Sequence, residues 1–295
     1  MSSVIIYIYI MENILDHILN IQNNGFTIIK NGIDIDLVDK VVSDFDYWSS
    51  LEYNNFKKFN KDRVTNFHIY SENTKNLVTN FYVNKILEKI FQKEQVIYSS
   101  LFFREGTSQH YHIDTPHFYT NPIDQYYGVW YSLEDINVNA GPLKYYIGSH
   151  KLVSYDEHEF FNNFVKNNPN YTNNGNDYSI LIEFNKKIEN LCKENNLECV
   201  DEKNYINKIN KGDIIIWHPK LLHGGSDIID PTLTRYSMVT HNVPIYTPVF
   251  NAAHFFAPKP TEQYLENKFT HEYIKHNNIN IFNHNSDPRV QKSYI

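Results

Sequence analysis

Cysteine is scarce in this chain of 295 residues, which contains only Cys192 and Cys199. Two cysteines are too few for a disulfide framework and are wrongly spaced for a zinc knuckle. We therefore expect two thiols in a reducing compartment. Glycine and proline are also few, with 10 and 11 residues, which argues against long disordered linkers. The composition predicts a folded protein whose stability does not depend on cross-links.

A long basic run is missing as well, and the formal net charge is -7. Both features argue against nucleic acid as a partner, because such binding needs cations that neutralise phosphates. The apolar run at residues 4–10 is too short to cross a bilayer and lacks the flanking features of a signal peptide. We interpret residues 1–10 as a frayed extension, with Met11 as an alternative translation start. The predicted location is the cytoplasm, without a membrane partner.

The pattern of apolar residues changes along the chain. Spacings of three and four predict helices in the first hundred residues, at 12–24, 34–48 and 84–94, with a short strand at 26–30. After Val96, short runs rich in β-branched and aromatic residues predict strands without helices between them. These runs are 96–104, 126–134, 141–148, 213–219 and 234–244. Such an order favours an antiparallel sandwich or jelly roll over a parallel βαβ sheet.

We expect a single domain over residues 1–295, with two additions to its strands. Residues 151–210 are polar, rich in asparagine and partly helical, so they are interpreted as an insertion and a possible lid. Residues 246–295 form a C-terminal extension. Its histidines are expected to be solvated, and those at two turns near predicted strands are expected to be structural. The first group is His271, His276 and His284, and the second is His150 and His218.

Residues 108–118, "SQHYHIDTPHF", place three histidines and an aspartate close together. In an extended segment residues i and i+2 point to the same side, so His112 and Asp114 can share a metal. His110 has the same parity and is a rival to His112, while His117 is interpreted as a surface residue or a neighbour of the site. A histidine and an aspartate at this spacing are a weak indicator by themselves, since a polar loop gives the same pattern by chance.

A mononuclear iron site that activates oxygen needs two imidazoles and one carboxylate, with other positions left open. The segment "KGDIIIWHPKLLHGGSD" supplies His223 after a buried-looking isoleucine run. Gly224 and Gly225 follow, and they would let backbone and ligands approach closely. Arg235 lies twelve positions after His223, with Ser237 two residues further on. A buried arginine fork beside a hydroxyl suits a carboxylate.

Taken in this order, these residues resemble the Fe(II)/2-oxoglutarate-dependent oxygenases. The flanking segments "VWYSLEDINVNAGPLKYYIGSHK", "KGDIIIWHPKLLHGGS" and "NNGFTIIKNGID" narrow the resemblance to the phytanoyl-CoA dioxygenase (PhyH-like) family. It covers roughly residues 15–245. The resemblance implies a mainly β fold with flanking helices, built on a double-stranded β-helix (a cupin-like jelly roll).

The resemblance also implies a set of site residues. Fe(II) would be held by His112, Asp114 and His223, and 2-oxoglutarate would bind Arg235 and Ser237. Trp130 matches a position that lines the cosubstrate pocket, and Thr115 and Phe102 are weaker candidates for the same lining. With O2, the cosubstrate would leave as succinate and CO2.

The reaction implied is the hydroxylation of a small molecule. Halogenases of this fold replace the carboxylate ligand with a small residue, so the presence of Asp114 favours hydroxylation or a related oxidation. Desaturation, cyclisation or epimerisation would use the same ligands. The alternative from another class is a jelly-roll protein that binds a metal and catalyses nothing. Phytanoyl-CoA itself is a poor candidate substrate, because no basic cluster suits the phosphates of CoA.

Overall fold

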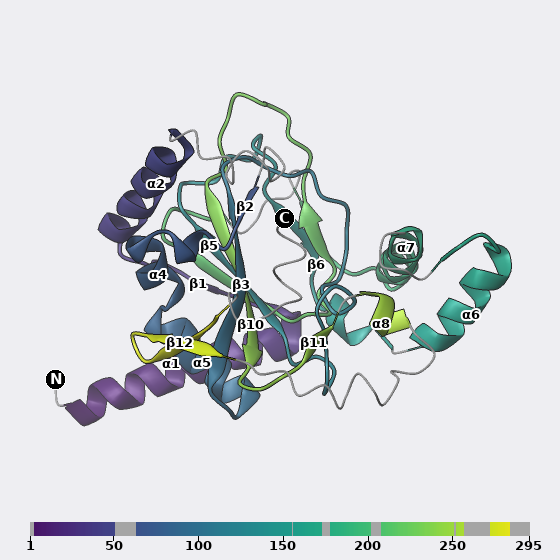
Figure 1. Ribbon diagram of the computed structural model, residues 1–295, viewed down its shortest axis with the longest axis horizontal. Coiled ribbons are helices and arrows are strands. Elements are labelled where there is room, and N and C mark those ends of the chain that lie inside the picture. Colours follow the sequence, from purple (N-terminus) through teal and green to yellow (C-terminus); the bar gives the residue numbers. More distant parts are fainter. Residues whose placement is uncertain are drawn as a thin grey trace.

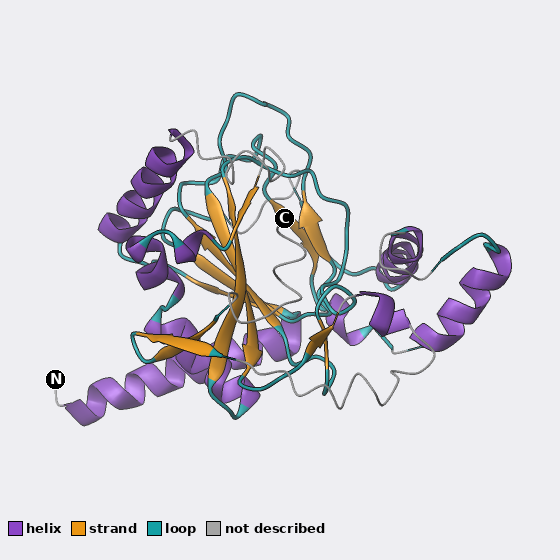
Figure 2. Ribbon diagram, in the orientation of Figure 1, coloured by secondary structure: helices purple, strands orange, loops and turns teal. Residues whose placement is uncertain are grey.

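Two β-sheets face each other at the centre of the molecule (Figure 1). The computed structural model describes residues 3–50, 63–154, 156–172, 178–201, 208–250, 252–256 and 272–283, with side chains described from residue 13 onward. Helices lie outside the sheets, and the space between the sheets is bordered by loops (Figure 2). This arrangement is the predicted jelly-roll core with flanking helices.

The larger sheet has eight strands in the order β1-β8-β5-β10-β3-β13-β12, with β2 paired to the free part of β3. Neighbours in the centre of this sheet run antiparallel, as predicted, whereas β13 runs parallel to β3. The strands are β1 (Phe26–Ile29), β2 (Arg63–Thr65), β3 (Gln95–Phe103), β5 (Tyr127–Ser132), β8 (Ile214–Trp217), β10 (Ser237–Pro244), β12 (Tyr273–His276) and β13 (Ile279–Phe282).

The smaller sheet has the order β7-β6-β9, and a separate pair joins β4 to β11. These strands are β4 (Tyr119–Thr120), β6 (Leu143–Tyr146), β7 (Cys199–Val200), β9 (His223–Gly225) and β11 (Val249–Phe250). His112 extends the smaller sheet through a backbone bridge to His223. The chain segment that carries the metal-ligand motif is therefore tied to β9.

The N-terminal helices cover the outer face of the large sheet (Figure 1). They are α1 (Ser3–Asn24), α2 (Ile35–Ser50), the 3-10 turn η1 (Phe67–Ile69), α4 (Glu72–Val78) and α5 (Phe81–Phe91). Asn80 caps α5 by accepting hydrogen bonds from the backbone amides of Tyr82 and Val83. On the covered face of the sheet, the ring of Phe102 stacks on that of Phe45 from α2, with centroids 3.9 Å apart. The main hydrophobic core lies in this layer.

The segment predicted as an insertion, 151–210, contains α6 (Glu157–Asn167) and α7 (Ser179–Glu194). It follows the 3-10 turn η2 (Ser149–Lys151), and α8 (Ala252–Phe256) packs beside it. Phe184 of α7 contacts Phe255 and Phe256 of α8, which gives these helices a hydrophobic cluster of their own. The helical character agrees with the sequence, whereas closure of this segment as a lid stays a prediction.

The two ends of the chain differ from expectation. The helix α1 begins at Ser3, so its backbone is helical through the segment interpreted as a frayed extension. The C-terminal extension is not simply a polar tail, because β13 is buried and pairs with β3. His276 is half-buried and lies 2.8 Å from Asn76 Oδ1, so the expectation that it is solvated was wrong. His271 and His284 lie outside the described residues.

Two further features bear on the compartment. Cys192 and Cys199 are not joined in a disulfide, and the hydroxyl of Tyr111 lies 3.0 Å from Cys199 Sγ. Among the described residues, no helix combines the length and the apolar character that a membrane crossing requires. The cytoplasmic location stays a prediction.

Candidate metal centre

The inward face of the large sheet forms one wall of a pocket of about 440 Å³. Side chains of paired residues in neighbouring strands point to the same face of a sheet. Val239 pairs with Leu101 on one side and with Trp130 on the other, and all three line the pocket. This apolar row forms the floor beneath the polar groups described next.

His112 and His223 face each other across a backbone bridge. The amide of His112 donates to the carbonyl of His223 at 2.8 Å, and the reverse bond measures 3.0 Å. A Cβ at Gly224 would lie 2.6 Å from the carbonyl oxygen of Gln109, which no side chain tolerates. Glycine at this position therefore lets the segment before His112 lie against β9, as its position after His223 predicted.

Three side chains bring one ligand atom each to a common point. His112 Nε2 lies 3.7 Å from Asp114 Oδ1, and His223 Nε2 lies 3.9 Å from the same oxygen. All three atoms lie within 4.8 Å of one another, and they are the one such metal-binding group among the described residues. The rival His110 is exposed and contributes only its carbonyl oxygen to the site.

Backbone carbonyls fix the tautomer of both imidazoles. His112 Nδ1 donates to the carbonyl of His110 at 3.0 Å, and His223 Nδ1 donates to that of Leu221 at 2.9 Å. Each Nε2 is then the unprotonated nitrogen, which is the form that ligates a metal. Burial lowers the pKa of His112 to about 3, assisted by the neighbouring His223. His112 is therefore a neutral imidazole.

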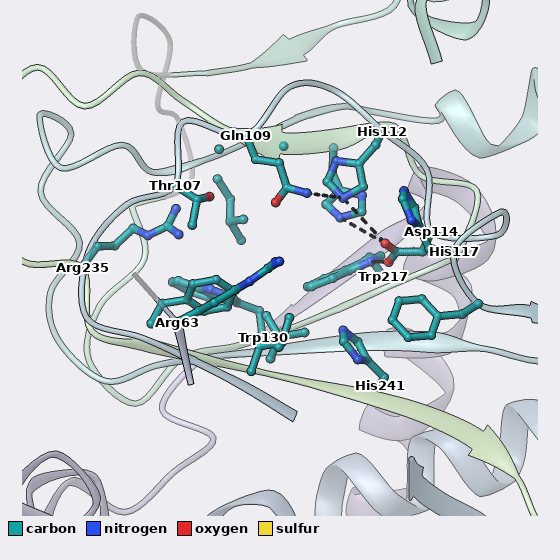
Figure 3. A pocket seen from close by; sticks show the side chains of 18 of the residues that line it. Arg63, Thr107, Gln109, His112, Asp114, His117, Trp130, Trp217, Arg235 and His241 are labelled. Atoms are coloured by element: carbon teal, nitrogen blue, oxygen red, sulfur yellow. Dashed lines mark hydrogen bonds and ion pairs between the residues drawn. The ribbon is translucent and has the colours of Figure 1, made fainter. Parts of the chain in front are cut away.

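Trp217 holds the carboxylate. Its indole Nε1 donates to Asp114 Oδ2 at 2.8 Å, which leaves Oδ1 directed at the two imidazoles (Figure 3). Burial by itself raises the pKa of Asp114, but His223, His112 and this hydrogen bond outweigh it and keep the pKa below its ordinary value. The carboxylate is therefore ionised and has a fixed orientation.

Gly128 makes room for the indole. It pairs with Trp217 across β5 and β8, and a Cβ at Gly128 would lie 2.2 Å from Trp217 Cε2. The ring thus lies flat over the glycine, where its N–H reaches Asp114. Neither Gly128 nor Trp217 was identified from the sequence, since a tryptophan after an isoleucine run looks like an ordinary core residue.

Arg235 lies at the other end of the pocket from the ligands (Figure 3). It is buried, with 3% of its surface exposed, and its Nη1 donates to the carbonyl of Gly141 at 2.6 Å. Thr107 lies beside it in the same view. An arginine held in this way presents a fixed fork to an anion bound between it and the three ligands.

The other predicted lining residues divide into two groups. Trp130 lines the pocket, whereas Ser237 does not, because its hydroxyl donates to the carbonyl of Arg235 at 3.2 Å. Phe102 points to the opposite face of β3, where it contacts the helical layer. Thr115 is buried and donates to Asp124 at 3.2 Å. The expectation that Phe102 and Thr115 line the pocket was wrong.

Several further polar residues line the pocket, and of these only His117 was interpreted from the sequence as a possible neighbour of the site. The amide of Gln109 donates to His112 Nε2 at 3.3 Å, so a metal at that nitrogen must displace this contact. His241 lies on the floor beside the row of Val239, and His117 and Arg63 face it. Tyr178, at the start of α7, brings the insertion to the rim. Among the residues that were not predicted, His241 offered a sequence signal, because it lies two residues after Val239 on the same strand.

Comparison with known proteins gives a family match over most of the chain. A family model described as phytanoyl-CoA dioxygenase (PhyH) matches residues 21–229. The phytanoyl-CoA dioxygenase domain-containing protein 1 homolog of Caenorhabditis briggsae is 29% identical over 109 residues. That alignment spans 34% of this chain and 38% of the relative, so the chain covers well under two thirds of that protein.

Solved structures with a similar fold include three proteins of low sequence identity. The epimerase SnoN, in complex with Fe3+, alpha ketoglutarate and nogalamycin RO, is 12% identical, covers 92% of this chain and 98% of its own, and has a TM-score of 0.58. EctD from S. alaskensis with bound Fe is 14% identical, covers 82% of this chain and 82% of its own, and has a TM-score of 0.57. HygX from Streptomyces hygroscopicus, with nickel and 2-oxoglutarate bound, is 13% identical, covers 78% of this chain and 87% of its own, and has a TM-score of 0.53. At these identities the likeness is one of fold.

Proposed function

This chain belongs to the phytanoyl-CoA dioxygenase (PhyH) family, and we propose that it is a 2-oxoglutarate-dependent dioxygenase whose iron(II) is held by His112, Asp114 and His223. The observation that carries the proposal is the convergence of two imidazole Nε2 atoms and one carboxylate oxygen within 4.8 Å. Two neutral imidazoles and one carboxylate are the donor set that suits non-haem iron(II). EctD, solved with bound Fe, and HygX, solved with nickel and 2-oxoglutarate, share the fold and support a metal and 2-oxoglutarate as the groups bound here.

The remaining length of the pocket fits the cosubstrate. Arg235 binds the carboxylate of 2-oxoglutarate that points away from the metal, and its bond to Gly141 fixes the direction of the fork. Trp130 and Val239 pack along the bound chain and exclude water from it. Ser237 contributes through the carbonyl of Arg235 and not by direct contact.

Bound iron(II) with 2-oxoglutarate and O2 supplies the oxidising power, and succinate and CO2 are the coproducts. The chain's own task is positioning. The bonds from Nδ1 of His112 and His223 to backbone carbonyls place the proton of each neutral imidazole on Nδ1 and leave Nε2 for the metal. Trp217 directs one oxygen of Asp114 at the metal, and the amide of Gln109 moves off His112 when the metal binds.

We propose hydroxylation of a small molecule as the reaction. Asp114 occupies a coordination position with a carboxylate from the protein, which favours hydroxylation over halogenation. The fold is shared with the epimerase SnoN and the carbocyclase SnoK, so epimerisation or ring closure is the second candidate outcome at the same site. The pocket volume of about 440 Å³, shared with the cosubstrate, limits how much of the substrate enters.

Turnover of the cosubstrate tests this proposal without a known substrate. The protein is incubated in air with Fe(II) and 2-oxoglutarate, alone and with a small-molecule library, and succinate is measured. We expect succinate from the wild-type protein above the level given by His223→Ala, and a larger amount with a true substrate. Equal succinate from the two proteins under every condition would contradict the proposal.

A further inference from the structure

Arg63 brings a second positive charge into the pocket from outside the jelly-roll core. It begins β2, and the register pairs it with Phe103 of β3. Phe103 lines the pocket, and paired residues share a face, so the side chain of Arg63 points inward as well. Figure 3 shows this side chain extending toward the centre of the pocket, separate from Arg235.

The charge of Arg63 is not matched by a neighbouring carboxylate in the part of the chain that the structure describes. No ion pair or hydrogen bond joins Arg63 to another described residue, although its guanidinium faces His117 and His241. Arg63 is therefore the fixed cation on this side of the pocket.

The ionised side chains that line the pocket have a net positive charge. Among the described lining residues, Arg63 and Arg235 carry +2 and Asp114 carries -1, which leaves +1. Iron(II) and doubly ionised 2-oxoglutarate cancel each other, so loading the site leaves this positive charge. Arg235 pairs with the cosubstrate, and the surplus is then that of Arg63. Arg63 is accessible to solvent, and the partner that matches its guanidinium best is one carboxylate that accepts two hydrogen bonds.

We propose that Arg63 binds a carboxylate of the substrate, so that the substrate class is a small monocarboxylate with an apolar portion. This inference rests on the proposed function and names the substrate class for the same site. Leu101 and Phe103 line the same pocket and would provide the apolar contacts. His117 and His241 border the subsite on the side of the metal ligands.

The test compares carboxylates with their own primary amides, which have the same shape without the charge. Butyrate, hydrocinnamate and N-acetylglycinate, and the three matching amides, are titrated calorimetrically into protein loaded with Fe(II) and 2-oxoglutarate under argon. Arg63→Gln is compared with wild type. Arg104→Gln is the matched control, because Arg104 follows β3, is exposed and does not line the pocket. Affinity for 2-oxoglutarate is measured in each protein, and circular dichroism checks folding.

We expect at least one carboxylate to bind wild type roughly ten- to a hundredfold more tightly than its amide, as a charge-assisted hydrogen bond predicts. That preference should vanish in Arg63→Gln and persist in Arg104→Gln, with 2-oxoglutarate affinity unchanged. The inference is overturned if wild type shows no preference in any pair, or if Arg63→Gln loses 2-oxoglutarate instead. Binding of 2-oxoglutarate to the Fe(II)-loaded protein separates the two proposals: a preference for carboxylates in a protein that binds no 2-oxoglutarate even with Fe(II) would remove the proposed function and keep the subsite.

Discussion

Trp217 and Asp114 are joined by a hydrogen bond of 2.8 Å from the indole Nε1 to Oδ2, and this bond decides which carboxylate oxygen faces the imidazoles. The same indole lies over Gly128, where any side chain would collide with it. The metal site therefore depends on a tryptophan and a glycine that carry no metal-binding atom. Outer residues of this kind commonly tune metal affinity as strongly as they orient the ligands.

Trp217→Phe removes the N–H donor and keeps an aromatic ring in the floor of the pocket. Asp114 then loses the bond that orients it, so Fe(II) affinity should fall by about 10- to 100-fold. The measurement is an anaerobic Fe(II) titration of the metal-free protein. Trp48→Phe, on α2 and away from the pocket, is the control and should bind Fe(II) like wild type. Unchanged affinity in Trp217→Phe would show that the ligand directions do not depend on this bond.

Gly128→Ala should destabilise the protein by about 1–3 kcal/mol, because the new methyl group overlaps the indole of Trp217. The overlap involves the atoms Cε2, Cζ2 and Nε1, which belong to both rings of the indole, and the single, smaller ring of phenylalanine fills less of this space. The loss should therefore shrink when Gly128→Ala is made in the Trp217→Phe background. Urea denaturation of the four proteins gives the coupling free energy. Additive losses would mean that the methyl is accommodated by a backbone shift.

Acid should destabilise the metal-free protein well before its carboxylates titrate. Burial lowers the pKa of His112 and His218 to about 3 and that of His241 to about 4. Below about pH 6.5 the unfolded chain takes up protons at these positions and the native protein does not, so the free energy of unfolding decreases as the pH is lowered. Each histidine contributes up to about 1.4 kcal/mol per pH unit.

His218→Asn tests this origin at a residue that is not a metal ligand, and its amide oxygen can still accept from the Lys220 amide. Urea denaturation between about pH 7.5 and 5 should give the variant a shallower loss of stability than wild type. The two slopes of unfolding free energy against pH should differ by the contribution of one histidine, up to about 1.4 kcal/mol per pH unit. Parallel curves for the two proteins would place the acid sensitivity in other groups.

Arg235→Lys should weaken 2-oxoglutarate by about tenfold or more and leave Fe(II) affinity nearly unchanged, because an ammonium group cannot reproduce the bidentate fork. Sequential titration with Fe(II) and then 2-oxoglutarate separates the two affinities. An equal loss of both would indicate that Arg235 supports the fold through Gly141 and does not select the cosubstrate.

The parts of the site that the sequence predicted are those fixed by chemistry and spacing. His112, Asp114 and His223 are residue types that few core positions require, and the glycines after His223 indicated a close approach. The positions of the strands along the chain also followed from local runs, and β3, β5, β8 and β10 lie within a few residues of their predicted ranges. These features depend on patterns among residues that are close together in the sequence.

The parts that could not be predicted depend on which face of a strand is turned inward. β3 is apolar on both faces, so the sequence did not distinguish Phe102, which meets the helices, from Phe103, which lines the pocket. In the sequence Trp217 cannot be told from a core residue, because its role depends on the pairing with Gly128 of another strand. The strand β13 follows a polar, asparagine-rich segment. It pairs with β3, from which nearly two hundred residues of sequence separate it. Arg63 was missed because β2 is only three residues long.

The central claim is that His112, Asp114 and His223 hold iron(II) together with 2-oxoglutarate. Its most direct test is an anaerobic titration of metal-free protein with Fe(II) and then 2-oxoglutarate, following the visible metal-to-ligand charge-transfer absorption, with Asp114→Ala alongside. The account predicts a band in the wild-type protein that is shifted or lost in the variant. Folded wild-type protein that binds iron but develops no band would contradict it, and would favour a jelly-roll protein that binds a metal without catalysis.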